Sequence, residues 1–278
     1  MTASLPAPIV AGVDGSAEAT DAVRWAARAA LRRRLPLELV HATAFPDLLV
    51  GGVVPPTEEA KDYLRRHGRH LLRAAADVAR GAGAPDVRDR LDTDRPAPAL
   101  LDLAAQAATV VVGHGRGRFG ALLAGSVATA LSAHAPCPVV VTRGDLWDAP
   151  GPAGPVVAGL DGGPDTVAVA AAAFAEADAL GAPLHVLHAK DDPEAGEFRP
   201  TLDEVLHEQG RHHPDVRVEH TVAAGRPRHE LLDRSAHAQL LVLGRRGRGG
   251  FPGLLLGSTA QAMVHHASCP VLITHAGQ

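Results

Sequence analysis

The sequence is poor in aromatic residues and in cysteine, and each shortage excludes a class of protein. Phe, Trp and Tyr make up 3% of the 278 residues, so a core has to be built from Ala, Val and Leu. Cys137 and Cys269 each stand before Pro-Val and an aliphatic run, which predicts small buried side chains. Two cysteines in this setting indicate neither a secreted disulfide framework nor a metal site.

Long apolar runs and a strong charge of one sign are also missing. No run approaches the roughly 20 apolar residues that a transmembrane helix needs, and the N-terminus lacks a basic stretch followed by an apolar signal core. The formal net charge of −4 provides no broad basic field of the kind that nucleic-acid binding uses. We therefore expect a soluble, cytoplasmic protein without a nucleic-acid or membrane partner.

Dispersed segments of the sequence occur twice, in the same order. The segment PIVAGVD, which ends on Asp14, has a counterpart VAGLD, which ends on Asp161, 147 residues later. His41 in LELVHA and His188 in LHVLHA have the same separation. Two dispersed matches at one separation establish an internal repeat.

The repeat predicts two tandem domains, residues 1–146 and 154–278, and each copy alternates five apolar strands with four helices. Strands that are apolar along their whole length need cover on both faces, and connections between parallel strands are right-handed. The sequence therefore predicts an α/β fold of two doubly wound, five-stranded parallel sheets, each Rossmann-like. The first and fourth strands of each sheet should be neighbours where the winding reverses, and ligands bind at such a point. The expected strands are 8–14, 37–42, 86–92, 109–113, 138–142, 157–161, 184–189, 215–221, 239–244 and 270–274.

A glycine-rich loop follows the fourth strand in each copy. The second loop, LVLGRRGRGGFPGLLLGS, places Gly244 and Gly247 before a Gly257-Ser258 pair that opens a helix. Glycines allow a close approach of the main chain, and the free N–H groups of a helix's first turn attract anions. The first loop, VVVGHGRGRFGALLAGS, repeats this order. A tight strand–helix turn without a ligand explains two matched copies less well than a pair of phosphate cradles does.

These motifs together resemble the universal stress protein family in its tandem, ATP-binding form. The resemblance rests on the Gly-x-x-Gly-x9-Gly-Ser loop, the strand-terminal Asp in GVDGS and GLDGG, the VHA and LHA second strands, and the CPV-type last strands. It covers nearly the whole chain, twice. It implies an adenine nucleotide alpha hydrolase-like variant of the Rossmann fold, with ATP, together with Mg²⁺, as the ligand.

The resemblance also implies which residues form the two sites. The strand-terminal Asp and the Gly two positions before it would lie beside the nucleoside, the Ala after the second-strand His would bind adenine through its main chain, and the loop residues would hold phosphates. In the first copy these residues are Gly12, Asp14, Ala42, Gly113, Gly115, Gly125 and Ser126. In the second copy they are Gly159, Asp161, Ala189, Gly244, Gly247, Gly257 and Ser258.

The family also suggests that domains pair through their last strands, and a homodimer is an open alternative. An apolar terminal edge agrees with such pairing, because an unpaired edge strand associates readily. The first loop is one residue shorter than the family pattern, so we expect the second copy to bind phosphates first. Asp14 and Asp161 have a second interpretation as helix caps, and we expect His41 and His188 to be packed, hydrogen-bonded strand residues. The loop arginines either are solvated or pair with phosphate: Arg116, Arg118, Arg245, Arg246 and Arg248.

The leading functional hypothesis is a regulatory, stress-response sensor with two adenine nucleotide sites and little or no turnover. Phosphoryl transfer needs metal ligands and a residue that orients the nucleophile, and the loops have no Walker lysine-serine pair, so any ATP hydrolysis should be slow and incidental. One alternative is a nucleotide-free interaction scaffold. Another is an adenylating enzyme, because residues 161–166 faintly resemble the SGGxDS loop of ATP pyrophosphatases.

Overall fold

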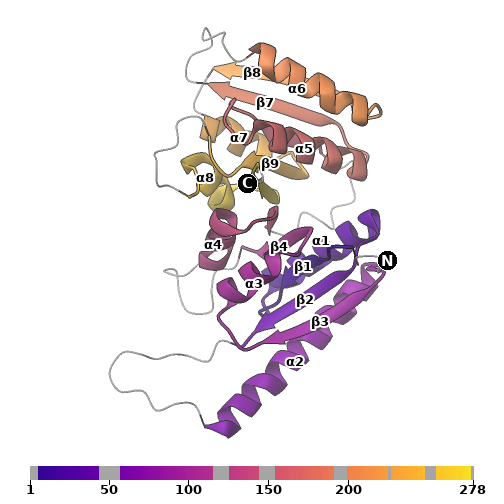
Figure 1. Cartoon of the computed structure of the whole chain (residues 1–278), viewed down its shortest axis with the longest axis vertical. Coiled ribbons are helices and arrows are strands. Elements are labelled where there is room, and N and C mark those ends of the chain that lie inside the picture. The colour runs from indigo at the N-terminus through magenta and orange to yellow at the C-terminus, as the bar shows by residue number, and fades with distance from the viewer. Residues whose placement is uncertain are drawn as a thin grey trace, which may run out of the picture. The chain divides into compact units, whose positions relative to one another are not determined.

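A computed structural model of the chain (Figure 1) describes residues 6–43, 57–114, 125–143, 154–190, 199–224, 227–247 and 255–276. The chain folds into two compact units. The first unit contains Met1–Leu131 and Ala135–Cys137, and the second contains Ser132–His134 and Pro138–Gln278. The expected end of the first domain, residue 146, lies outside the described residues.

Strands and helices alternate along the chain as the sequence predicts. The first repeat contains β1 (Ile9–Gly12), α1 (Ala17–Arg33), β2 (Leu37–Ala42), α2 (Glu58–Gly81), β3 (Val87–Asp92), α3 (Pro96–Ala104), β4 (Thr109–Gly113), α4 (Ser126–His134) and β5 (Val139–Thr142). The second contains β6 (Val156–Gly159), α5 (Thr166–Leu180), β7 (Leu184–Lys190), α6 (Arg199–His212), β8 (Val218–Ala224), α7 (Pro227–Ser235), β9 (Leu240–Gly244), α8 (Ser258–His266) and β10 (Val271–Thr274).

The sheet of the first unit has the strand order β3-β2-β1-β4, and its strand pairs are parallel. Helices α1 and α2 pack against each other and against the sheet, and α3 packs on β1, β2 and β4. The core is aliphatic, as the shortage of aromatics requires, and Ile9, Leu37 and Leu39 are fully buried. The chain reverses its winding direction between β1 and β4, so the predicted switch point is present in this unit.

The second unit repeats this order as β10-β9-β6-β7-β8, with β5 added beside β10. Its pairs are parallel except that β5 and β10 are antiparallel, with Val141 opposite Val271. β5 therefore belongs structurally to the second unit, although the sequence assigns it to the first repeat. The two last strands pair with each other, and this pairing buries the apolar edge that each would otherwise expose.

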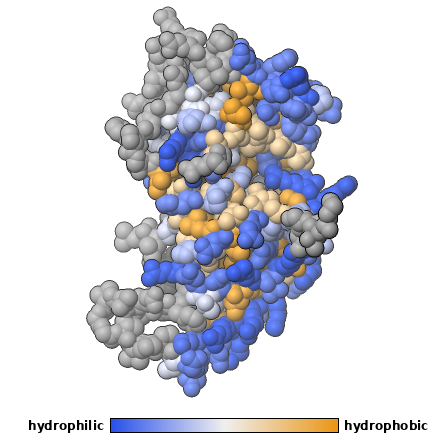
Figure 2. Space-filling view, viewed as in Figure 1, coloured by the Kyte–Doolittle hydropathy of each residue, from blue (hydrophilic) through white to orange (hydrophobic). Residues whose placement is uncertain are grey.

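The edge strands and the outer helices are the exposed parts of the two units. β3 and β8 end their sheets, and Val218 and Val222 on β8 are 37% and 42% exposed. Figure 2 shows a hydrophilic surface over α2 and α6. None of the helices in the described part of the chain combines the length and apolarity that a membrane crossing requires.

Both cysteines are buried, which confirms the prediction from their sequence context. Burial raises the pKa of the Cys137 thiol from an ordinary 9.0 to about 11 and that of Cys269 to about 12. Buried, protonated thiols are poor nucleophiles, since the thiolate is the reactive form. The two side chains therefore serve as small packing groups.

We expect both thiols to resist alkylation by iodoacetamide at pH 8 in the folded protein and to react fully in denaturant. With pKa values of 11 or more, about one thiol in a thousand is ionised at that pH. A raised folded-state pKa stabilises the fold below pH 9, and this contribution is lost as the pH rises from 9 toward 12. Mass spectrometry of the modified protein measures the labelling, and rapid native labelling of either cysteine would contradict the burial.

Candidate functional site

A cavity of about 330 Å³ opens in the second unit at the carboxyl ends of β6 and β9. These strands are parallel neighbours, with Gly159 opposite Leu243. The sequence predicts a crevice at this point because β6 and β9 are the first and fourth strands of the repeat. Six of the seven residues predicted for the second site line the cavity: Gly159, Asp161, Gly244, Gly247, Gly257 and Ser258.

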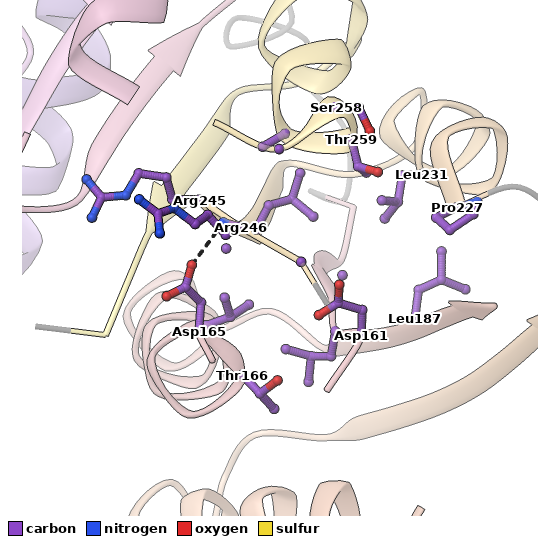
Figure 3. A pocket seen from close by; sticks show the side chains of 18 residues that line it. Asp161, Asp165, Thr166, Leu187, Pro227, Leu231, Arg245, Arg246, Ser258 and Thr259 are labelled. Carbon is purple, nitrogen blue, oxygen red and sulfur yellow. Dashed lines mark hydrogen bonds between the residues drawn. The ribbon is translucent and has the colours of Figure 1, made fainter. Parts of the chain in front are cut away.

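Asp161 lies two residues after the end of β6, and its carboxylate accepts a hydrogen bond within the turn that follows. Oδ1 accepts a hydrogen bond from the Gly163 N–H at 2.9 Å, and the N-cap of α5 is Asp165, so the alternative interpretation of Asp161 as a helix cap is wrong. Oδ2 lies against Gly247, where an added Cβ would collide with it. Glycine at position 247 therefore allows the second glycine loop (residues 244–257) to approach a carboxylate (Figure 3).

Main-chain hydrogen bonds fix both ends of the second glycine loop. The Arg245 N–H donates to the Thr274 carbonyl at 2.9 Å, and the Gly257 N–H donates to the Arg245 carbonyl at 2.8 Å. Gly257 is the N-cap of α8 and has no side chain that could bond the first N–H groups of that helix. These N–H groups carry the positive end of the helix dipole, and Ser258 and Thr259 beside them line the cavity.

The two described arginines of this loop line the cavity, and their side chains extend to one side of it. Arg245 Nη1 donates to the Ala133 carbonyl at 3.1 Å. Burial lowers the pKa of Arg245, and the nearby Asp165 carboxylate opposes this shift. Figure 3 shows both the Arg245 and the Arg246 side chain extending away from Asp161 and Leu231. The predicted Arg248 lies outside the described residues, as do Arg116 and Arg118 of the first loop.

The sequence analysis did not identify the apolar wall of this cavity. Leu187 of β7 and the pair Pro227 and Leu231 of α7 line it (Figure 3). The signal was present, because Pro96 and Leu100 of α3 hold the same positions in the first repeat and line a cavity there. Both α3 and α7 begin with a proline, and one face of each helix borders a cavity.

The second-strand histidines are structural, as predicted. His188 Nδ1 lies 2.7 Å from the Leu160 carbonyl, and His41 Nδ1 lies 2.7 Å from the Val13 carbonyl. A carbonyl only accepts, so Nδ1 carries the proton in both rings. Each histidine thereby ties its strand to the residue that precedes the strand-terminal Asp. Ala189 follows His188 in β7, and its side chain lies outside the described part of the structure.

The first unit has a smaller cavity, of about 130 Å³, at the ends of β1 and β4. Four predicted residues line it: Gly12, Asp14, Ala42 and Gly113. The Asp14 carboxylate accepts hydrogen bonds from the main-chain N–H and the hydroxyl of Ser16, at 2.9 and 2.5 Å. Gly113 packs so tightly on the start of α1 that an added Cβ would collide with the Glu18 main chain.

The predicted phosphate end of the first cavity is not assembled in the same way. Gly125 and Ser126 are not among the residues that line this cavity, and Gly115 lies outside the described residues. Gly125 has a left-handed φ of 82°, whereas its counterpart Gly257 has a φ of −67°. The two repeats therefore present different main-chain conformations at the start of α4 and α8.

Comparison with known proteins yields one family. The sequence profile described as the Universal stress protein family matches residues 7–143 and 153–275. A universal stress protein of Mycobacterium tuberculosis is 36% identical over 95% of this chain and 95% of its own length. A universal stress protein of Archaeoglobus fulgidus shares the fold, with a TM-score of 0.77 and 16% identity over 98% of this chain and 97% of that one. A half-length universal stress protein solved in complex with cAMP matches 51% of this chain at 28% identity, with a TM-score of 0.40.

Proposed function

The chain belongs to the universal stress protein family, and we propose that it acts as a regulatory protein that binds an adenine nucleotide in the second-unit cavity. One observation carries the proposal. A strand-terminal carboxylate, an apolar wall and the uncapped start of a helix border the same cavity of about 330 Å³. A nucleotide has three matching parts. The ribose hydroxyls suit the carboxylate, the base suits the apolar wall, and the phosphates suit the start of the helix.

We infer an orientation from the chemistry of each wall. The phosphates would lie at the N-terminus of α8, beside Gly257 and Ser258, where main-chain N–H groups favour anions. The base would pack on Pro227 and Leu231, and the ribose hydroxyls would donate to Asp161. A volume of about 330 Å³ lies within the range of small-ligand sites, roughly 300–1,000 Å³.

The first-unit cavity is the weaker candidate for the second of the two expected sites. Its volume of about 130 Å³ is below the usual range for a nucleotide site. Its lining contains the ribose side of the predicted site but not Gly125 or Ser126. We therefore expect one nucleotide per chain at low concentration and weaker occupancy, if any, of the first unit.

Mg²⁺ fits this site as an ion that binds together with the nucleotide, through the phosphate oxygens. Protein sites for Mg²⁺ commonly supply one or two carboxylates and leave the other positions to phosphate oxygens and water. With Asp161 on the ribose hydroxyls, phosphate oxygens and water would hold the ion, because the described residues contain no group of three or more His, Cys, Asp or Glu side chains that could hold a metal by themselves. When bound, the ion would neutralise phosphate charge.

We expect little or no turnover of the bound nucleotide. Hydrolysis needs a group that orients or deprotonates the attacking water. Asp161 and Asp165 are the carboxylates that line the described part of the cavity, and both accept hydrogen bonds from main-chain N–H groups. Asp165 accepts from the Arg246 and Ala276 N–H groups, so we expect it to hold the main chain rather than to orient an attacking water.

Isothermal titration calorimetry of the nucleotide-free protein with AMP and ATP, with and without Mg²⁺, tests the proposal. We expect about one adenine nucleotide per chain with a micromolar Kd, which corresponds to about −8 kcal/mol. Absence of heat and of retention in equilibrium dialysis at millimolar nucleotide would reject the proposal and leave the scaffold hypothesis. Release of AMP and pyrophosphate from ATP in an acceptor screen would instead indicate the adenylating enzyme.

A further inference from the structure

Asp165 is a buried carboxylate that joins three distant parts of the second unit. The residue is 7% exposed and lies at the start of α5. Its Oδ2 accepts a hydrogen bond from the Arg246 N–H at 3.0 Å (Figure 3), and its Oδ1 accepts one from the Ala276 N–H at 3.0 Å. It thereby connects the start of a helix, the second glycine loop and the segment after β10.

This carboxylate does not act as a helix cap, although it occupies the N-cap position. It makes no side-chain capping hydrogen bond to α5, and the Thr166 N–H donates to the Gly163 carbonyl instead. A buried charge is costly unless hydrogen bonds compensate it. Two main-chain donors, the positive end of α5 and the nearby Arg245 guanidinium provide that compensation.

The contacts of Asp165 lie where the main chain enters the cavity. Gly244 packs directly on its side chain, because an added Cβ there would lie 2.8 Å from the Asp165 Cβ. The Arg246 N–H is held next, and the following residue, Gly247, lines the cavity. One side chain therefore fixes the course of the chain over the residues that lead into the predicted phosphate cradle.

The first repeat has a different residue at this position. The position equivalent to Asp165 is Glu18, which lies in the first turn of α1, where Ser16 provides the helix cap. Residues 115–124 of the first glycine loop lie outside the described residues. The two repeats share the Gly and Asp motifs but differ in the residue at the start of the first helix.

We propose that Asp165 is a positioning residue of the second-unit nucleotide site, which holds the start of the second glycine loop against the segment that follows β10. The inference rests on the proposed function and adds a reason why the second unit would hold a nucleotide. Asp165 orders the main chain before the ligand arrives, so that less conformational entropy is lost when the nucleotide binds.

The substitution Asp165→Asn tests this inference, because it keeps the shape of the side chain and replaces one acceptor oxygen with a donor NH₂. We expect the AMP Kd to rise about 10-fold, since hydrogen bonds to a charged group are among the stronger ones. We also expect the amides of Arg246 and Ala276 to exchange with deuterium about 10-fold faster in the nucleotide-free protein. Glu18→Gln is the matched control at the equivalent position and should change neither quantity.

The two measurements separate the failure of this inference from that of the proposed function. Lack of AMP binding by the wild-type protein would reject the nucleotide site, while the exchange rates would still test whether Asp165 holds the loop. Wild-type Kd and exchange rates in Asp165→Asn would overturn the positioning role. A lower Tm of Asp165→Asn together with an unchanged AMP Kd would also overturn the positioning role, because a purely structural carboxylate gives that result. The Kd is measured at a temperature well below the unfolding transition of the variant.

Discussion

Gly257→Glu should weaken nucleotide binding in the second unit by at least about 100-fold, or about 2.7 kcal/mol, while the protein stays folded. Gly257 has a φ of −67°, which any residue adopts, and the nearest atom to an added Cβ is the Arg245 carbonyl oxygen at 3.4 Å. The Gly247 nitrogen follows at 3.7 Å, so the new side chain would project toward the loop that lines the predicted phosphate cradle. Its carboxylate would occupy this space and repel a phosphate.

Calorimetry with AMP and ATP measures this loss, and Gly257→Ala is the matched control. A methyl group fits at ordinary van der Waals distance, so the alanine variant should bind within about 3-fold of wild type, a difference of less than about 0.7 kcal/mol. Circular dichroism should report a similar Tm for the two variants. Wild-type affinity in the glutamate variant would mean that the nucleotide does not use the start of α8.

Phe174→Ala should lower the free energy of unfolding of the second unit by about 3–5 kcal/mol, the usual cost of removing a fully buried phenyl ring. Phe174 is 0% exposed and is among the largest fully buried side chains. Its ring packs against the His213 ring, with centroids 6.0 Å apart, and α5 covers the sheet beside β6. The surrounding core is largely aliphatic, and we expect its side chains to fill only part of the cavity that the substitution leaves.

Hydrogen exchange of the β6 and β9 amides measures this effect, because these central strands open only when the unit unfolds. Tyr63→Ala is the control, since Tyr63 is an aromatic side chain that is 62% exposed. Its removal should change stability by less than about 0.5 kcal/mol. An equal effect of both substitutions, or a cost below about 1 kcal/mol for Phe174→Ala, would contradict the packing of α5.

Local sequence patterns were sufficient to predict the fold class and much of the position of the candidate site. Buried strands, helical periodicity and the repeat separation predicted the order of strands and helices, since each depends on neighbouring residues. Strand-terminal Asp161 and the glycines after β9 meet in one cavity because parallel strands end at the same edge of a sheet. Their assignment to a bound nucleotide stays a prediction.

The apolar wall and the loop anchor depended on packing between distant segments. Asp165 looks like an ordinary helix cap in the sequence, yet its hydrogen-bond partners lie 81 and 111 residues away. Leu231 likewise shows helical periodicity without indicating that its face borders a cavity.

The sequence by itself determined the repeat, the α/β architecture and the family, because these follow from local periodicity and motif order. Only the tertiary structure decided that β5 and β10 pair in antiparallel register, that Gly257 and Gly125 differ in conformation, and that Asp165 binds the main chain of the second glycine loop. The physical reason is that hydrogen bonds and packing between distant segments depend on the positions of whole strands and helices, which no short stretch of sequence specifies.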